Sequence, residues 1–203
     1  MRILLILLFI SFNSFGQTFE ERFNSGLQLI NNSKFNEAII VFTKLIEIDP
    51  LSTNAYVNRA LAKEYLGNYS DAITDLTKAI EINPNYGLAY YNRAKNNQTI
   101  KDFNKAISDY SQVLQIDVEY APPPIHSFSY LNRGSCYYEL FKYELAINDF
   151  NEAIKLNPNL SQAYFNRAMA KANSGQANFC DDFQKAYELG NAPAKEYIDN
   201  YCN

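Results

Sequence analysis

A block of 34 residues recurs along this sequence, and that repetition limits the folds available to the chain more than any other feature. The stretch AITDLTKAIEINPNYGLAYYNRA at 72–94 returns as AINDFNEAIKLNPNLSQAYFNRA at 146–168. An Asn-Arg pair followed by a small residue marks successive blocks at intervals of 34, 40 and 34 residues. A fixed period of this size indicates stacked copies of one small structural unit, with six residues inserted between the third and fourth copies.

Each block has the pattern of two helices joined by a tight turn. In the second block, Tyr56 and Ala60 lie one turn apart on a first helix, and Gly67 is placed to end it. Apolar residues at helical spacing then continue to Pro84, whose ring stops the second helix. One such pair cannot bury its apolar face alone, so the sequence predicts an all-α chain in which neighbouring pairs stack.

These marks resemble the tetratricopeptide repeat (TPR) family. The first helix of a unit has an aromatic residue near its start and a small residue four positions later. A turn with glycine and an aromatic residue follows. The second helix then carries small and large apolar residues in alternation, and a proline ends the unit. In the second block they stand at Tyr56, Ala60, Gly67, Tyr69, Ala72, Leu76, Ala79 and Pro84, and in the fourth at Tyr130, Gly134, Tyr143, Ala146, Phe150, Ala153 and Pro158. The resemblance implies a right-handed α-solenoid filling 17–203, with five helix-turn-helix units and a C-terminal capping helix. The expected units are 19–52, 53–86, 87–120, 127–160 and 161–190, with an insertion at 119–126 and the capping helix at 192–202.

The first 16 residues have the layout of a secretory signal peptide. A single charge at Arg2 precedes the apolar run 3–10, and small residues at Ser14 and Gly16 suit cleavage before Gln17. An uncleaved membrane anchor is the alternative, although eight apolar residues are too few to span a bilayer. We therefore expect an exported protein, periplasmic or secreted, with no membrane insertion after cleavage.

The charge and the residue types argue against several function classes. Asp and Glu outnumber Lys and Arg by 22 to 18, and no run of basic residues occurs, so a nucleic-acid partner is not expected. His126 is the only histidine, and no glycine-rich phosphate loop is present. Acyl transfer therefore lacks a base, and a metal site lacks its usual ligands. We expect a chain that is not an enzyme and has no cofactor or metal.

One arginine and one aspartate recur in each of the last four units. An arginine follows every marker asparagine, and an aspartate stands on the second helix of the same unit. The arginines could form an anion-binding ladder, but partly buried charges persist only when they are paired. The pattern favours structural ion pairs between the two helices of a unit. The residues are Arg59, Arg93, Arg133 and Arg167, with Asp75, Asp109, Asp149 and Asp182.

The marker asparagines are expected to face the inner surface of the superhelix. The TPR resemblance implies that an asparagine at this position can form hydrogen bonds with the backbone of a bound peptide. The alternative is that it forms a local hydrogen bond that stabilises the stack of units. A groove beside these amides would be aromatic and apolar, which suits an extended or helical peptide. A clamp for carboxylates would need several basic residues, and only Lys95 qualifies. The predicted groove consists of Val57, Asn58, Leu61, Tyr65, Tyr91, Asn92, Lys95, Leu131, Asn132, Ser135, Tyr138, Phe165, Asn166 and Met169.

The insertion at 119–126 contains three consecutive prolines, 122–124. They predict a stiff polyproline II segment that excludes helix. It could be a spacer between the third and fourth units or a contact for a partner. His126 is expected to be a loop residue.

Two of the three cysteines could form a disulfide. Cys180 opens the last second helix and Cys202 ends the expected capping helix, so an antiparallel arrangement brings them together. Two unpaired thiols are the alternative, because the sequence does not establish the separation of the Cβ atoms. Cys136 is expected to be a buried small apolar residue.

Two functions remain open at this point. One is an exported adaptor or scaffold whose concave groove binds a peptide or protein segment. The other is a structural subunit of an envelope complex, or a self-associating protein, that uses the convex face, the proline insertion or the termini. The exposed aromatic groove favours the first, because such a surface is otherwise an aggregation liability.

Overall fold

The computed structural model describes residues 18–117 and 123–202, which form eleven α-helices and no strand. The predicted all-α solenoid is confirmed over these residues. The predicted signal peptide at 1–16 and residues 119–122 of the predicted insertion lie outside them. None of the helices in the described ranges is long and apolar enough to cross a membrane.

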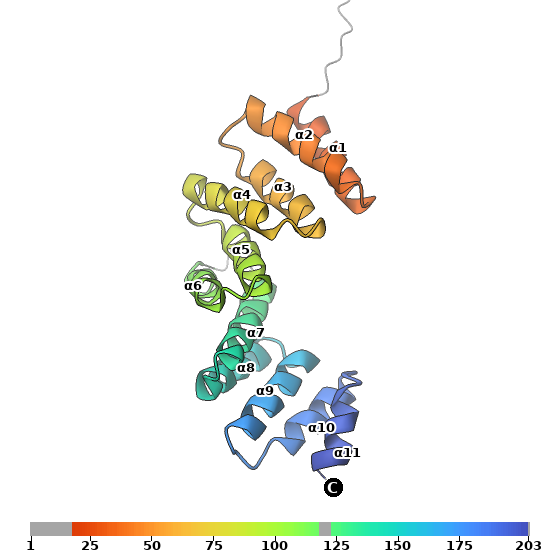
Figure 1. Cartoon of the computed structure of the whole chain (residues 1–203), viewed down its shortest axis with the longest axis vertical. Helices are drawn as coiled ribbons and strands as arrows, with labels where there is room; N and C mark the ends of the chain where they lie inside the picture. The colour runs from red at the N-terminus through yellow and green to blue at the C-terminus, as the bar shows by residue number, and fades with distance from the viewer. Residues whose placement is uncertain (1–17, 118–122, 203) are drawn as a thin grey trace, which may run out of the picture.

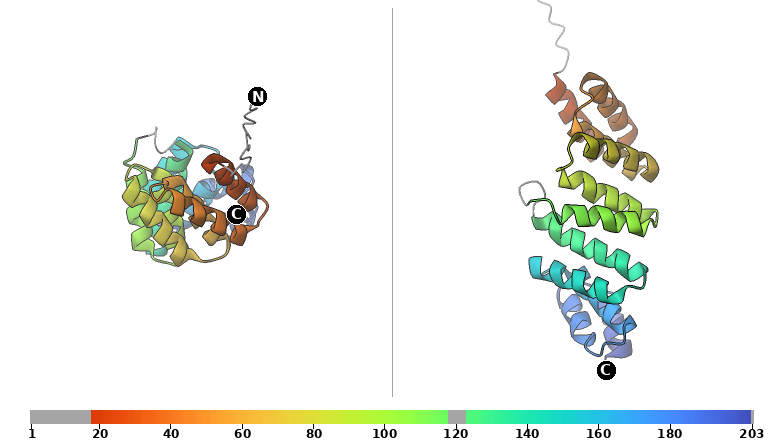
Figure 2. Two further views of the ribbon diagram at one scale, coloured as in Figure 1. Left: turned by 90° about the horizontal axis from the view of Figure 1, so that it is seen from above. Right: turned by 90° about the vertical axis from the view of Figure 1, so that its left-hand side faces the viewer.

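Consecutive helices pack as antiparallel pairs, and the pairs stack along the long axis of the molecule (Figures 1 and 2). The five pairs are followed by one single helix, so that the N-terminal and C-terminal units lie at opposite ends. The helices are α1 (Phe19–Asn31), α2 (Phe35–Ile48), α3 (Thr53–Tyr65), α4 (Tyr69–Ile82), α5 (Gly87–Thr99), α6 (Phe103–Val113), α7 (Pro123–Glu139), α8 (Tyr143–Leu156), α9 (Ser161–Asn173), α10 (Cys180–Glu188) and α11 (Ala194–Tyr201).

The turn inside each pair needs one residue in the left-handed conformation. Gly67 and Gly175 take it at φ 78° and 77°, and glycine does so without steric cost. In the other three pairs the equivalent turn position is occupied by Ser33, Lys101 and Phe141, at φ 59°, 63° and 58°. The turn geometry is therefore imposed by the packing of the two helices even where the local residue disfavours it.

The two helices of a unit approach closely because small residues face each other. In the fourth unit Gly134 of α7 lies against Ala146 and Phe150 of α8. A Cβ on Gly134 would stand 2.8 Å from Phe150 Cε1, which is closer than packed atoms tolerate. The second unit has Ala60 opposite Leu76 at the same positions, and both are buried. A larger residue on one helix is thus matched by a smaller one on the other.

We expect Gly134→Ala to lower the stability of the protein. Alanine favours a helix by about 1 kcal/mol over glycine, but the overpacking against Phe150 costs about 1–3 kcal/mol, so a net loss on the order of 1 kcal/mol should appear in urea unfolding. Adding Phe150→Leu recreates the Ala60–Leu76 pair of the second unit and should recover part of the loss. An unchanged midpoint for Gly134→Ala would contradict this packing.

The arginine–aspartate pairs predicted from the repeats are confirmed. Arg93 donates from Nε and Nη2 to Asp109 at 2.9 and 2.7 Å, and Arg59 and Arg133 bind Asp75 and Asp149 in the same bidentate way. The fourth such pair is Arg167 with Asp182. Every Nη1 also donates to the preceding unit's second helix, at Thr43, Thr77, Ser111 and Asn151. The pairs therefore join helices within a unit and also tie each unit to the one before it.

The prediction that the prolines exclude helix is wrong for the last two of them. Helix α7 begins at Pro123 and includes Pro124, so it starts before the expected boundary at 127. The first turn of a helix has no internal partner for its N–H groups, and proline lacks that group, so prolines fit there. His126 is likewise a helical residue and not a loop residue, with its Nε2 3.1 Å from the carbonyl oxygen of Val113.

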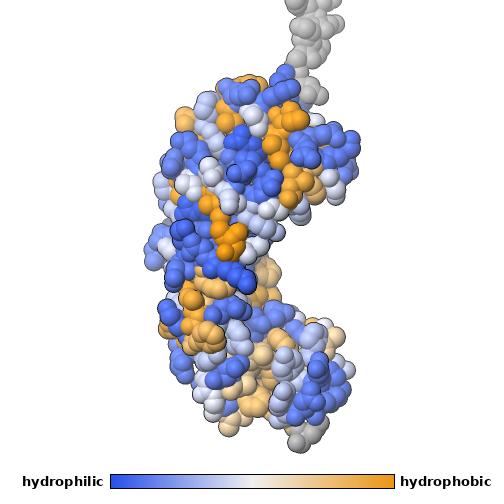
Figure 3. Space-filling model, viewed as in Figure 1, coloured by the Kyte–Doolittle hydropathy of each residue, from blue (hydrophilic) through white to orange (hydrophobic). Residues whose placement is uncertain are grey.

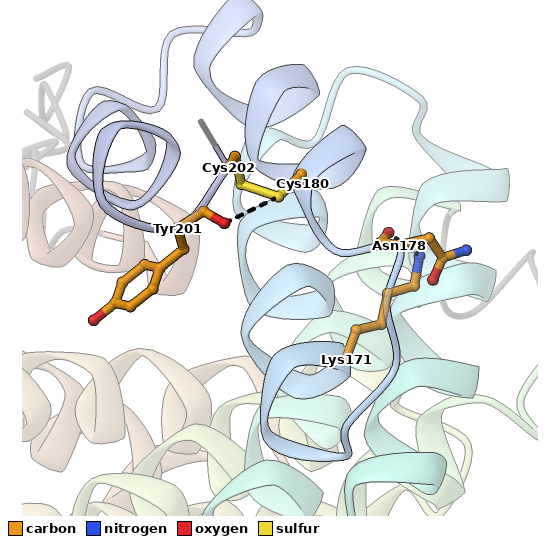
Figure 4. The surroundings of a disulfide bond; sticks show 5 residues. All are labelled: Lys171, Asn178, Cys180, Tyr201 and Cys202. Atoms are coloured by element: carbon orange, nitrogen blue, oxygen red, sulfur yellow. Dashed lines mark hydrogen bonds between the residues drawn. A yellow bond between two sulfur atoms is a disulfide. The ribbon is translucent and has the colours of Figure 1, made fainter.

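The C-terminal end is closed by a disulfide between Cys180 and Cys202, whose Cα atoms are 5.6 Å apart. Figure 4 shows this bond joining the start of α10 to the residue after α11, beside the carbonyl group of Tyr201. The bond holds α11 over the last pair, where Tyr197 stacks on Phe183. Cys136 is free and buried, and burial raises the pKa of its thiol to about 12.

Candidate functional site

The first helices of the units face the hollow side of the molecule. Figure 3 shows the surface curving around an open recess, and Figure 1 places α3 and α5 toward it, with α4 and α6 on the opposite side. This is the surface on which the sequence predicts the groove.

The marker asparagines are engaged mainly with their neighbours. Asn58 donates to the carbonyl group of Asn54, one turn earlier on α3. Asn132 donates to the hydroxyl group of Tyr91 at 3.3 Å, and Asn166 donates to Ser135 Oγ at 3.1 Å. The last two bonds connect the first helices of adjacent units. These contacts support the interpretation in which the asparagines stabilise the stack.

Two predicted groove residues lie in the core instead. Val57 and Leu131 are only 4% and 7% exposed and pack among other buried apolar side chains. Tyr91 and Phe165 have the same register, one residue before the marker asparagine, but their larger rings stay partly exposed, whereas the shorter side chains of Val57 and Leu131 end in the helix interface. Neither is accessible to a ligand, so both predictions are wrong.

Several residues in the N-terminal half of the predicted surface make contacts within the protein. Lys95 forms an ion pair with Glu64 of the preceding unit at 3.1 Å. The ring of Tyr65 stacks on Phe35, with centroids 4.6 Å apart, and Leu61 packs against the apolar cluster of the first unit. Tyr91 accepts the hydrogen bond of Asn132 described above. The backbone carbonyl group of Asn92, and not its side-chain amide, accepts the hydrogen bond of Asn96 Nδ2.

The C-terminal half contains a pocket that brings five predicted residues together. It lies between α7 and α9, has a volume of about 280 Å³, and is called here the α7/α9 pocket. Sequence reasoning missed two of its residues. Glu139 is one turn beyond Ser135 on the same face of α7, so helical spacing could have identified it, whereas Phe150 reaches the pocket from α8. The lining residues are Ser135, Tyr138, Glu139, Phe150, Phe165, Asn166 and Met169.

The walls of the α7/α9 pocket differ in character. Phe150, Phe165 and Met169 supply apolar surface, while Ser135 and Asn166 supply a hydroxyl and an amide. Phe165 is fixed by edge-to-face contacts with Phe183 and Tyr197, whose ring centroids are 5.5 and 5.3 Å away. The pocket is therefore largely formed before any ligand arrives, which limits the entropy cost of binding.

Tyr138 provides a neutral polar group at this pocket. Burial, with smaller contributions from Tyr143 and Glu139, raises the pKa of its phenol above the ordinary value. The hydroxyl group therefore stays protonated at neutral pH. It accepts a hydrogen bond from Asn173 Nδ2 at 3.0 Å, which orients the ring. Glu139 adds an exposed carboxylate next to it, so the rim carries negative charge.

Comparisons with known proteins agree with this repeat geometry. One tetratricopeptide repeat model matches residues 53–86 and 127–160, which are the bounds predicted for the second and fourth units. A second tetratricopeptide repeat model matches residues 88–118. The chain belongs to the tetratricopeptide repeat family. Proteins with this fold are interaction scaffolds that bind protein or peptide partners.

One curated relative is the heat shock protein STI1 of Saccharomyces cerevisiae. It is 36% identical over 85 residues, which cover 40% of this chain and 14% of the yeast protein. Because this TPR chain matches only a small part of STI1, the similarity concerns the repeats and not the whole yeast protein.

Several solved structures share the fold. MamA superposes with a TM-score of 0.75 at 21% identity, covering 92% of this chain and 96% of MamA. YrrB, described as a TPR protein with an unusual peptide-binding site, gives a TM-score of 0.73 at 14% identity, over 90% of this chain and 92% of YrrB. PilF of Pseudomonas aeruginosa gives 0.70 at 19% identity, over 84% and 72%. At these identities the likeness establishes the solenoid fold alone.

Proposed function

We propose that this TPR protein is a non-enzymatic adaptor that binds a peptide or protein segment in the α7/α9 pocket. The observation that carries the proposal is the convergence of three apolar side chains with an amide, a hydroxyl and a phenol around one cavity of about 280 Å³. Ligand pockets in proteins combine apolar walls with a few placed polar groups in this way. Elsewhere in the predicted groove, Lys95 pairs with Glu64, and Tyr65 stacks on Phe35 while remaining 60% exposed.

The lining indicates the kind of segment that fits. One large apolar or aromatic side chain would enter between Phe165 and Met169, since burying such a side chain contributes about 2 kcal/mol. Asn166 and Ser135 could then bind the segment's backbone. A basic residue beside the anchor would meet Glu139 at the rim, where a charge pair contributes more to association rate and orientation than to affinity.

We expect Ser135→Leu to abolish most of this binding. The larger side chain fills the pocket, and the second unit already carries Leu61 at the equivalent position. The change also removes the hydroxyl group that accepts from Asn166, so circular dichroism should first confirm that the variant is folded. Peptides selected on the wild-type protein from a random displayed library should bind the variant at least about tenfold more weakly by calorimetry, as for the loss of a central anchor. Thr74→Leu makes a similar change on exposed α4 and should leave the affinity unchanged. Equal affinities for wild type and Ser135→Leu would reject the pocket.

We also propose that the protein acts outside the cytoplasm. The charge, apolar run and small residues of 1–16 support export, and a disulfide such as Cys180–Cys202 persists in oxidising compartments. Amino-terminal sequencing of the protein isolated from its native cells should begin at Gln17. Recovery of the chain with its first 16 residues attached would count against cleavage and favour a retained anchor.

A further inference from the structure

The position four residues after each repeated arginine differs between units in an informative way. In the second unit it is Lys63, whose ammonium lies 2.7 Å from Asp75 Oδ2. In the fifth unit it is Lys171, whose ammonium lies 2.9 Å from Asp182 Oδ2. Each aspartate in these two units therefore pairs with two cations, the arginine and the lysine.

The fourth unit fills the same place with an aromatic ring. Tyr137 lies beside Arg133, with its ring centroid 5.9 Å from the guanidinium carbon. In three units, then, a long side chain covers the ion pair. The third unit has Asn97 at this position, and its side chain is too short to reach over Arg93 and Asp109.

A cavity of about 510 Å³ lies beside the ion pair of the third unit, between α4, α5 and α6. Asn97 lines it, is only 3% exposed, and its amide makes no hydrogen bond with any residue in the described ranges. The amide atoms of Asn97 face this cavity without a partner from the described residues, so they offer a polar occupant both a donor and an acceptor. The polar lining includes Ser70, Thr77, Arg93, Asn97, Ser108 and Asp109.

The electrostatics favour a cation over an anion at this place. Asp109 Oδ2 accepts from Arg93 Nε, as Asp75 Oδ2 does from Arg59 Nε, but the second unit adds Lys63 Nζ on that same oxygen. A carboxylate has about four acceptor sites, so Arg93 leaves capacity for a further donor. An anion would instead face the carboxylate of Asp109.

Lys105 is the other cation that lines the cavity. Its ammonium is 2.7 Å from Asp102 Oδ2, and its side chain is 73% exposed. It therefore lies toward solvent with its own counter-charge and does not take the place of Lys63. Ile73 and Ile100 add apolar surface along which an alkyl chain can lie.

We propose that this cavity binds a primary ammonium at the end of an alkyl chain, supplied by a lysine side chain of a partner protein. The ammonium would donate hydrogen bonds to Asp109 Oδ2 and to the side-chain oxygen of Asn97, and its alkyl stem would lie against Ile73 and Ile100. The partner's lysine thus restores the two-cation arrangement that the second and fifth units build from their own residues. This site is separate from the α7/α9 pocket and does not depend on the function proposed for it.

The test is a nuclear magnetic resonance titration of the full chain with n-butylamine, which has the length and charge of a lysine side chain. We expect saturable shifts of the Asn97 and Asp109 amide signals, and no comparable shifts with neutral 1-butanol. Asn97→Lys supplies the missing lysine internally and should weaken n-butylamine binding at least about tenfold, since a hydrogen bond to a charged group is lost. Butanol binding as well as butylamine would overturn the proposal.

Two further variants separate filling of the cavity from an added charge. Asn97→Met fills it without charge and should weaken binding as Asn97→Lys does, whereas Asn104→Lys adds the same charge at an exposed position of α6 and should not. Equal weakening by Asn104→Lys would reject a specific site. A lysine-containing capped tripeptide should bind at least as tightly as butylamine, while tighter binding of spermidine than of the tripeptide would contradict a partner's lysine as the source.

Discussion

Arg133→Ala should lower the free energy of unfolding by about 3 kcal/mol, because it leaves the carboxylate of Asp149 buried without its partner. The side chains of Arg133 and Asp149 are only 18% and 8% exposed, and two hydrogen bonds of 2.8 and 2.7 Å join them. The change also removes the bond from Nη1 to Ser111 of the preceding unit. Urea unfolding monitored by circular dichroism measures the effect.

A matched control lies on α8, the helix that carries Asp149. Lys155 forms an exposed pair with Glu152 at 3.3 Å, and such pairs contribute about 0.5 kcal/mol or less, so Lys155→Ala should be nearly silent. Burial already raises the pKa of Asp149, against the opposing effect of Arg133. The penalty of the variant is therefore present when Asp149 is ionised and is relieved as pH falls through its folded-state pKa. Equal losses for the two variants would mean that the repeated pairs are no more than surface contacts.

Cys202→Ser should cost on the order of 3 kcal/mol, concentrated at the C-terminal end. The disulfide closes a loop with a sequence separation of 22 residues, and cross-links of this size stabilise mainly by restricting the unfolded chain. The short helices α10 and α11 have few other neighbours, since they end the stack. Hydrogen exchange should therefore accelerate in these two helices and much less in α3 and α4.

Reductant provides the control for this prediction. It should reproduce the effect in the wild-type protein and do nothing further to Cys202→Ser, because that variant has lost the Cys180–Cys202 bond and its remaining cysteines, Cys136 and Cys180, are both thiols. Unaltered exchange in α10 and α11 would show that packing of Tyr197 and Phe183 alone holds the end of the solenoid.

Most of the fold could be predicted from the repeat period, because each unit can bury its apolar face only against a neighbouring copy. The small residues and the arginine–aspartate pairs could be assigned from their register alone. The start of α7 could not, since Pro123 and Pro124 are helix breakers everywhere except in a first turn, and the sequence does not show where that turn begins. Proline is unfavourable inside a helix, but Pro123 and Pro124 stand in the first turn of α7, where it is tolerated.

The candidate site was predictable only in part. Five residues of the α7/α9 pocket were found because the superhelix turns that face of each first helix toward the recess. Val57 and Leu131 were misplaced because they share the register of Phe165, and the register alone does not show that their shorter side chains end in the core. Contacts between units, such as Lys95 with Glu64, depend on how the units stack, and a single repeat does not encode that.

The most direct test of the central claim is a hydrogen-exchange footprint of the full chain with and without a peptide selected on it from a displayed library. Binding in the α7/α9 pocket predicts slowed exchange over 135–139 and 165–169, lost in Ser135→Leu. Slowed exchange confined to the exposed face of α8, to 123–126 or to α11 would contradict that claim, and would favour a structural or self-associating protein that uses those surfaces.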